Sequence, residues 1–285
     1  MVVRGLADLE DQSDGGRSSG MGGARAVPSG GVAPMALPVL PSIKEIMFPQ
    51  ARWRSFIGVM STIDVVMFLI TLIVGATRDG AFVKANSMAG PSSQTLLAMG
   101  AIEKLKLIKH YEVWRLFSAV VLHAGLLHIG LNLVFQCNIG FVYEALWGTS
   151  RMAVIYWVSG VGASLTSATL GEAISVGASG ALMGLLGAII SYIVFNWNEL
   201  PDAPQRLCNI IILLVLNFGL GLTSTGIDNY AHLGGLVYGL LIGGGLVKKY
   251  TYSAKENTAR KVLTGLTIVL FVVELAVVFT TGGAP

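Results

Sequence analysis

The amino-acid sequence predicts an all-α protein that crosses a membrane several times, and three observations lead to this fold class. Hydrophobic residues make up 53% of the 285 residues, and the mean hydropathy is +0.69. Charged residues make up only 12%, whereas soluble domains carry about 25%. Seven apolar segments approach the roughly 20 residues that a helix needs to cross the hydrocarbon core. We therefore expect a polytopic helical membrane protein.

The predicted spans follow one another with short connections, apart from one long loop. They lie at residues 55–77, 116–146, 152–171, 177–197, 207–223, 231–247 and 262–280. The second range contains a span together with the residues that lead into it, and the fifth is short and rich in glycine. The loop 78–115 is basic and contains an amphipathic stretch near residues 96–108. This pattern predicts seven transmembrane helices.

The chain divides into three predicted regions. Residues 1–54 form a tail whose glycine pairs and prolines leave little apolar surface to bury, so we expect it to be disordered. Its start lacks the apolar region of a secretory signal, and its acidic residues are unusual for a mitochondrial presequence. Residues 55–250 form the core with six spans. Residues 251–285 form a linker and the seventh span.

Basic residues near the ends of the spans predict the orientation in the membrane. Lysines and arginines occur before span one and between spans two and three, four and five, and six and seven, whereas the connections 172–176 and 224–230 have none. The long loop 78–115 departs from this pattern, but long loops follow the rule weakly. We therefore expect a cytosolic N-terminus and an outward C-terminus, in a membrane of the secretory pathway or the plasma membrane.

Two polar residues occupy the same end of two predicted spans. Ser179 lies in Gly177-Ala178-Ser179-Gly180, and His232 follows 53 residues later in Ala231-His232-Leu233-Gly234-Gly235. In the predicted topology both lie near the outer face, at a common depth. Polar side chains inside a membrane are costly and commonly functional. A serine and a histidine suffice for nucleophilic catalysis, because the imidazole can take the hydroxyl proton.

Glycines next to this pair favour close approach of the two helices. Gly180, Gly184 and Gly187 follow the serine, while Gly235 and Gly239 follow the histidine. Small residues at four-residue spacing let membrane helices pack closely. A hydrogen bond of about 2.8 Å between side chains on two helices requires such packing.

The second span supplies further donors. His128 and Asn132 are four residues apart and share one helix face, and His123 lies shortly before them. Side-chain donors of this kind can bind the oxyanion of a tetrahedral intermediate together with the backbone N–H of Ser179. That N–H lies in the first turn of its helix, where amides are unpaired and the helix dipole favours negative charge.

Each polar residue also has a simpler explanation when it is considered alone. A serine in a membrane helix can pack or bond to its own backbone, a histidine can be a satisfied core residue, and Asn132 can join helices. Their shared depth, side and glycine context favours the catalytic interpretation. For Asp64 and Glu274, which lie within spans, we expect structural roles, either hydrogen-bonded in the bundle or facing a cavity. Cys137 and Cys208 are expected to be packing thiols.

In these motifs the chain resembles the rhomboid intramembrane serine proteases, over roughly residues 95–247. The motifs that carry the resemblance are Trp114-Arg115, His123, His128-x-x-x-Asn132, Glu144-x-x-x-Gly148, Gly177-x-Ser179-Gly180 and Ala231-His232-x-x-Gly235-x-x-x-Gly239. Several motifs in the right order make the resemblance specific.

The resemblance implies a rhomboid-like six-helix bundle plus one additional C-terminal helix, as in the eukaryotic secretase-type members. It implies a Ser179 nucleophile and a His232 general base, with His128 and Asn132 at the oxyanion site and no cofactor or metal. The motif residues with implied structural roles are Trp114, Arg115, Glu144, Gly177, Gly180, Gly235 and Gly239. The Trp114-Arg115 loop is expected to lie partly in the membrane. Met183 is a departure, because many relatives carry there an aromatic residue that stacks on the catalytic histidine.

The expected function is an intramembrane endopeptidase that cuts single-span membrane proteins near the outer end of their helices. The alternative is a catalytically silent rhomboid-like protein that binds membrane clients. A transporter with Asp64 and Glu274 on an ion path is a third possibility, but the sequence lacks the repeated halves common in transporters. No H-E-x-x-H motif for a zinc protease occurs. No basic run with aromatics indicates nucleic-acid binding, so the expected partners are membrane substrates and lipid.

Overall fold

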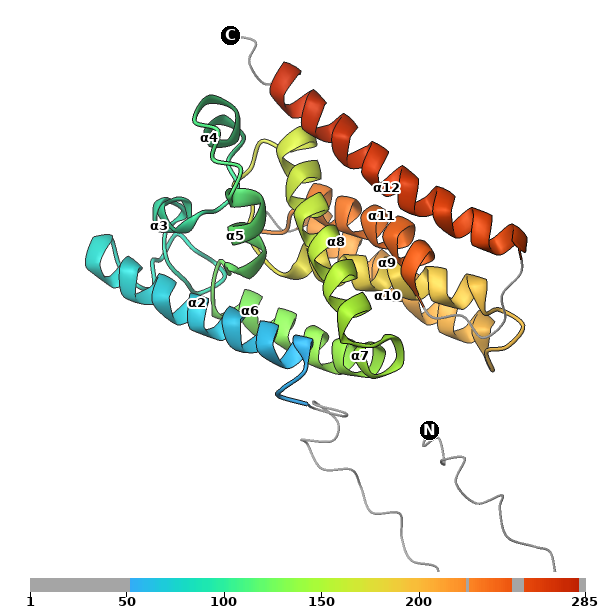
Figure 1. Cartoon of the computed structure of the whole chain (residues 1–285). Coiled ribbons are helices and arrows are strands. Elements are labelled where there is room, and N and C mark those ends of the chain that lie inside the picture. Colours follow the sequence, from blue (N-terminus) through green and yellow to red (C-terminus); the bar gives the residue numbers. More distant parts are fainter. Residues whose placement is uncertain (1–51, 224–225, 248–253, 282–285) are drawn as a thin grey trace, which may run out of the picture. The chain divides into compact units, whose positions relative to one another are not determined.

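The computed structural model describes residues 52–223, 226–247 and 254–281. These residues form helices and connections without a β-strand, apart from one isolated bridge between Ile102 and Ser175 (Figure 1). The predicted all-α fold class is confirmed. The predicted tail lies, apart from residues 52–54, outside the described residues, so its disorder stays a prediction.

Helices occur at each of the seven predicted spans. They are α2 (Phe56–Arg78), the continuous run of α6 (Leu126–Phe135), η1 (Gln136–Gly140) and α7 (Phe141–Trp147), α8 (Thr149–Leu170), α9 (Ser179–Phe195), α10 (Ala203–Thr223), α11 (Asn229–Leu246) and α12 (Ala254–Thr281). Within the described residues, five of these are long and apolar enough to cross a membrane: α2, Leu126–Trp147, α8, α10 and Lys255–Thr280. Helix α9 is also apolar but shorter. The chain is an integral membrane protein with several spanning helices.

The long loop contains short helices, and its end explains where the second span begins. Helices α3 (Ser93–Met99), α4 (Lys104–Lys109) and α5 (Arg115–Val121) precede a break at residues 122–125. The N–H groups of Leu126 and Leu127 donate to the carbonyls of Ala89 and Met88, at 2.8 and 3.2 Å. Because residues 88–89 cap its first turn, α6 begins at Leu126. The predicted range 116–146 therefore divides into α5 and a membrane span.

The centre of the bundle consists of α8, α9 and α11. Helix α11 packs extensively against both α9 and α8, and α9 also packs against α8. In Figure 1, α12 runs beside α8 and α11, which it contacts. Helix α10 buries only Ala203, so it is the least enclosed of the spans. The two helices with the predicted site residues Ser179 and His232 are therefore adjacent in the core.

A buried polar network joins α2, η1 and α8. The Nε2 atom of Gln136 donates to Ser61 Oγ and Asp64 Oδ2, both at 3.0 Å, and Tyr156 donates to Gln136 Oε1 at 3.0 Å. Gln136 lies in the π-helical turn η1, where the backbone is locally widened. The Asp64 carboxyl is thus hydrogen-bonded inside the bundle, which is one of the two expectations for it.

Candidate active site

Ser179 is the first residue of α9, and the chain before it is held by backbone hydrogen bonds. Ile102 and Ser175 exchange two such bonds, at 2.9 and 3.2 Å, and the Gly177 N–H donates to Ala119 O at 2.8 Å. Gly177 has a φ of +132°, which L side chains rarely adopt. The glycine two residues before the serine therefore allows the turn from this held segment into the helix.

His232 lies in the first turn of α11, with its ring directed at the serine. Its Nε2 atom is 3.0 Å from Ser179 Oγ, and the side chain is buried. Asp228 caps α11 by accepting from the N–H groups of Tyr230 and Ala231, and the Ser167 hydroxyl donates to it. His232 Nδ1 is buried and has no hydrogen-bond partner in the described part of the chain. Among the described residues, no carboxylate hydrogen-bonds to His232 as a third member of this pair.

Glycines bring α9 and α11 within reach of this hydrogen bond. A Cβ atom added at Gly235 would lie 2.0 Å from Gly180 O, and one added at Gly239 would lie 2.0 Å from Gly184 O. Side chains at these positions would therefore hold the helices apart. Each of the four glycines belongs to the pattern that predicted close packing, and the structure pairs them across one interface.

His128 and Asn132 of α6 supply side-chain donors to the cavity that Ser179 borders. His128 Nδ1 accepts from Ala124 N at 3.3 Å, so a neutral ring carries its proton on Nε2. A Cβ atom at Gly177 would lie 2.9 Å from that Nε2 and 3.5 Å from Ser179 Oγ. The Nδ2 group of Asn132 is buried without an acceptor among the described residues. Two side-chain donors are thus available for a negatively charged oxygen in this cavity.

These groups line a cavity of about 450 Å³. Its walls come from the loop after α2, from α6, from residues 173–177, and from the starts of α9 and α11, with Asn217 contributed by α10. Ser179, His232, His128 and Asn132 all border the same space. His123 lies behind His128, edge-on with ring centroids 5.4 Å apart, and is fully buried. It therefore supports the His128 ring and does not border the cavity.

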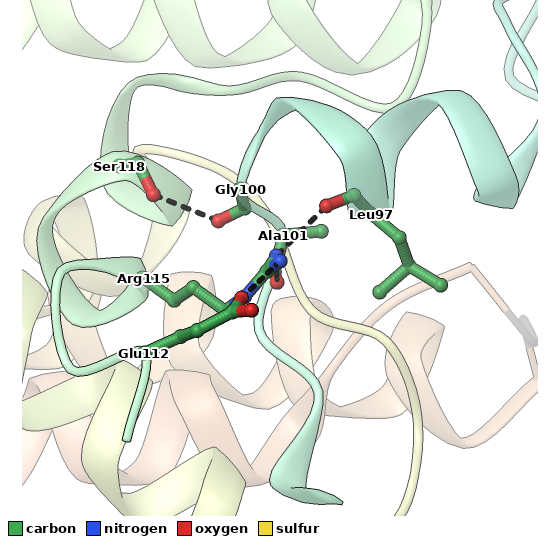
Figure 2. A network of polar contacts seen from close by, with 6 residues as sticks. All are labelled: Leu97, Gly100, Ala101, Glu112, Arg115 and Ser118. Atoms are coloured by element: carbon green, nitrogen blue, oxygen red, sulfur yellow. Dashed lines mark hydrogen bonds and ion pairs between the residues drawn. The ribbon is translucent and has the colours of Figure 1, made fainter. Parts of the chain in front are cut away.

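The Trp114-Arg115 motif braces the loop that holds Ser175 and Gly177. Figure 2 shows Arg115 reaching the carbonyls of Leu97 and Ala101, to which its Nη1 donates at 2.8 Å each, and pairing with Glu112. The guanidinium also lies 4.7 Å from the centroid of the Trp114 ring. Arg115 is buried although it is charged. Its contacts fix the chain next to Ile102, which forms the bridge to Ser175.

Gly100 completes this brace. It has a φ of +109°, and the Ser118 hydroxyl donates to its carbonyl at 2.8 Å (Figure 2). A Cβ atom at Gly100 would lie 2.4 Å from the Trp114 ring. The amphipathic stretch therefore breaks into α3 and α4 at this glycine.

Glu144 lies on α7, near the end of the helical run 126–147, and His128 lies near the start of that run. Its carboxylate accepts from the N–H groups of Phe56 and Ile57, at 2.8 and 2.9 Å, and from the Thr149 hydroxyl at 2.8 Å. It caps the first turn of α2, where amides lack partners within the helix. Glu144 therefore joins α2 to α7 and α8 and takes no part in the cavity.

The sequence interpretation missed the aromatic neighbour of His232. Phe218 of α10 lies edge-on to the imidazole, with ring centroids 6.4 Å apart. Met183, at the position where many relatives carry the aromatic residue, is buried in the core. No sequence signal pointed to Phe218, because the apolar residues of α10 look alike.

Comparisons with known proteins identify relatives of this chain. A family model described as "Rhomboid domain" matches residues 110–249. "Rhomboid-like protease 1" of Toxoplasma gondii is 31% identical over 252 residues, 85% of this chain and 82% of that protein. "RHOMBOID-like protein 1" of Arabidopsis thaliana is 39% identical over 180 residues, 62% of this chain. The match covers only 46% of that relative's length.

A further relative bears on activity. "Inactive RHOMBOID-like protein 8" of Arabidopsis thaliana is 35% identical over 153 residues, 53% of this chain and 43% of that protein. The chain therefore spans less than half the length of two of these relatives. One of these two similar proteins is named as inactive. The matched domain and the near-full-length similarity to the Toxoplasma protein establish that the chain belongs to the rhomboid family.

Proposed function

We propose that the protein is an intramembrane serine endopeptidase in which Ser179 is the nucleophile and His232 the general base. The observation that carries this proposal is the 3.0 Å contact between Ser179 Oγ and His232 Nε2, beside a cavity bordered by His128 and Asn132. A serine hydroxyl is a weak nucleophile unless a base is hydrogen-bonded to it. The contact supplies that base.

The first half of the proposed reaction transfers the acyl group to the serine. His232 Nε2 takes the hydroxyl proton as Ser179 Oγ attacks the carbonyl carbon of a peptide bond. Negative charge then develops on the carbonyl oxygen, near the unpaired Asn132 amide, the His128 Nε2–H and the Ser179 N–H. The imidazolium gives its proton to the leaving nitrogen, the C–N bond breaks, and an ester remains on Ser179.

The second half releases the product. His232 takes a proton from water, the resulting hydroxide adds to the ester, and the same donors bind the second oxyanion. The C–Oγ bond then breaks and the proton returns to Ser179. Because His232 Nδ1 has no partner among the described residues, the packing of the ring, including the Phe218 contact, is what orients the base.

The proposed substrates are single-span membrane proteins, cut near the outer end of their helices. This follows from the predicted orientation, with a cytosolic N-terminus, an outward C-terminus and Ser179 toward the outer face. A helical peptide bond is shielded by its own hydrogen bonds, so the target segment must unwind. Glycine or proline in the outer half of the substrate helix makes unwinding easier, and a small residue before the cut suits a glycine-lined site.

The alternative is a silent protein that binds membrane clients, and the inactive relative is what favours it. The two functions predict different results for one variant. A protease loses its function with Ser179→Ala, whereas a client-binding protein keeps it.

The test uses the purified full chain in liposomes with a single-span reporter. Wild type and Ser191→Ala should cleave the reporter, and Ser179→Ala should not. Ser191 is a matched control because it lies on the same helix and donates to Leu240 O of α11 at 2.8 Å, away from the dyad. Cleavage by Ser179→Ala at the wild-type rate would overturn the proposed function.

The same products test the site of cleavage. Mass spectrometry of the fragments should find the cut in the outer half of the reporter helix, in liposomes where the orientation of both proteins is checked by protease protection. A cut at the cytosolic end would contradict the proposed orientation.

A further inference from the structure

Glu274 lies within residues 262–280 of α12, and its carboxyl group makes polar contacts between this helix and the core. Glu274 of α12 accepts from Thr166 Oγ1 of α8, at 2.9 Å to Oε1 and 3.1 Å to Oε2, and from the Tyr238 hydroxyl of α11 at 3.0 Å. A carboxyl group in a membrane span is costly and faces the bundle when it occurs. We infer that Glu274 is a positioning residue, which holds α11 so that His232 faces Ser179. This inference rests on the proposed function.

The Tyr238 contact lies on the side of α11 toward α8 and α12. At 3.6 residues per turn, His232, Gly235 and Gly239 share the face toward α9, whereas Gly234 and Tyr238 lie on average about 110° around the helix from that face. The α9 face has backbone contacts across Gly235 and Gly239. The position and rotation of α11 therefore also depend on its contacts with α8 and α12.

Gly162 and Thr166 of α8 pack against this side of α11. A Cβ atom at Gly162 would lie 2.3 Å from the Tyr238 ring, and one at Gly234 would lie 2.4 Å from Thr166 Oγ1. The Tyr238 ring is fully buried. Its hydroxyl and that of Thr166 both meet the Glu274 carboxyl, so one group on α12 joins α8 to α11.

Packing alone does not give α12 this register. Its own apolar side chains Phe271, Leu275, Val278 and Phe279 pack in a cluster with residues of α4, α5 and α8. Lipid tails are as apolar as these side chains, so the hydrophobic effect does not drive the helices together in a bilayer. The hydrogen bonds that Glu274 makes with Thr166 and Tyr238 are directional, and they fix which turn of α12 lies against Tyr238.

The test compares Glu274→Leu with Glu274→Gln in the full-length protein. Leucine loses the contacts with both Thr166 and Tyr238 and frees α11 to shift, and a displacement near 1 Å costs about 10²-fold in rate. We expect kcat to fall at least tenfold with KM within twofold. Glutamine can accept from Tyr238 through its carbonyl and donate to Thr166 through its amide, so we expect kcat within twofold of wild type.

A second readout needs no substrate binding. A serine-directed fluorophosphonate should label Ser179 at least tenfold more slowly in Glu274→Leu and at the wild-type rate in Glu274→Gln. Thr264→Val is the matched control, because Thr264 of α12 contacts Gly245 of α11 while its hydroxyl donates to Arg260 O within its own helix. If Glu274→Leu does not fold, Tyr238→Phe keeps the buried ring, removes the α11 hydroxyl and should slow labelling.

The outcomes separate this inference from the function on which it rests. An active wild type with unchanged kcat in Glu274→Leu, or a change in KM alone, overturns the positioning role. Equal losses for Glu274→Gln and Glu274→Leu overturn the hydrogen-bond explanation. A wild type that neither cleaves reporters nor reacts with the fluorophosphonate overturns the proposed function, and the inference with it.

Discussion

Substituting Gly235 by alanine should separate the dyad while leaving both of its side chains in place. The new Cβ atom would lie 2.0 Å from Gly180 O, and ordinary contact begins at 3.4 Å. The helices must therefore move apart by about 1.4 Å at this level, because both contacting groups are close to the backbone. The Ser179–His232 distance is 3.0 Å, and hydrogen bonds of this kind end near 3.2 Å. The substitution removes the bond.

We expect a loss of about 10²-fold in kcat for Gly235→Ala, which corresponds to about 2.7 kcal/mol at the transition state. Overpacking should also cost about 1–3 kcal/mol of stability. Reporter cleavage in liposomes measures the first and thermal unfolding the second. The control is Gly265→Ala on α12, where an added Cβ meets nothing within 4 Å; it should keep full activity. Wild-type kcat and stability in Gly235→Ala would refute the close-packing argument.

Three further predictions concern single contacts. Asn132→Ala should lower kcat about tenfold or more with little change in KM, since its buried amide acts on developing charge; steady-state kinetics with the reporter decides this, and a change in KM alone would count against it. Arg115→Lys should lower stability by about 1–3 kcal/mol, because one of the two carbonyls it binds loses its partner; an unchanged melting temperature would be inconsistent with the brace. Outside the spans, hydrogen bonding from the Ser92 hydroxyl holds the pKa of Asp79 below its usual range. Because the folded pKa is lowered, this stabilisation is complete above about pH 4 and is lost as the pH falls through the folded value. The protection of the amides of residues 92–96 from hydrogen exchange, relative to their intrinsic rates at each pH, should therefore fall in acid in the wild type and not in Asp79→Asn.

The arrangement of the candidate site followed from patterns that a single sequence carries. Hydropathy placed Ser179 and His232 at the same ends of their spans, and the glycine spacing after each predicted that α9 and α11 approach closely. Gly235 and Gly180 now form that contact. The close approach was predictable because helix periodicity is a local property of the chain, and the common membrane depth of the two residues stays a prediction.

Other features depend on contacts between distant segments, which no local pattern encodes. The second span begins at Leu126 because the carbonyls of Met88 and Ala89 cap it. The aromatic neighbour of His232 is Phe218 of α10. In many relatives the aromatic residue is at the position where this chain has Met183. The partners of Glu274 come from two other helices, so the sequence predicted a structural role without naming what it joins.

The most direct test of the catalytic dyad is covalent labelling by a fluorophosphonate, followed by mass spectrometry of the modified residue. The account predicts that Ser179 is labelled in the wild type and in Ser191→Ala, and that labelling is lost in His232→Ala. Cleavage by Ser179→Ala, by His232→Ala and by the double variant should fall to the same level, because two residues that act as a unit are not additive. Labelling of Ser179 at the wild-type rate in His232→Ala would contradict the claim that His232 activates Ser179.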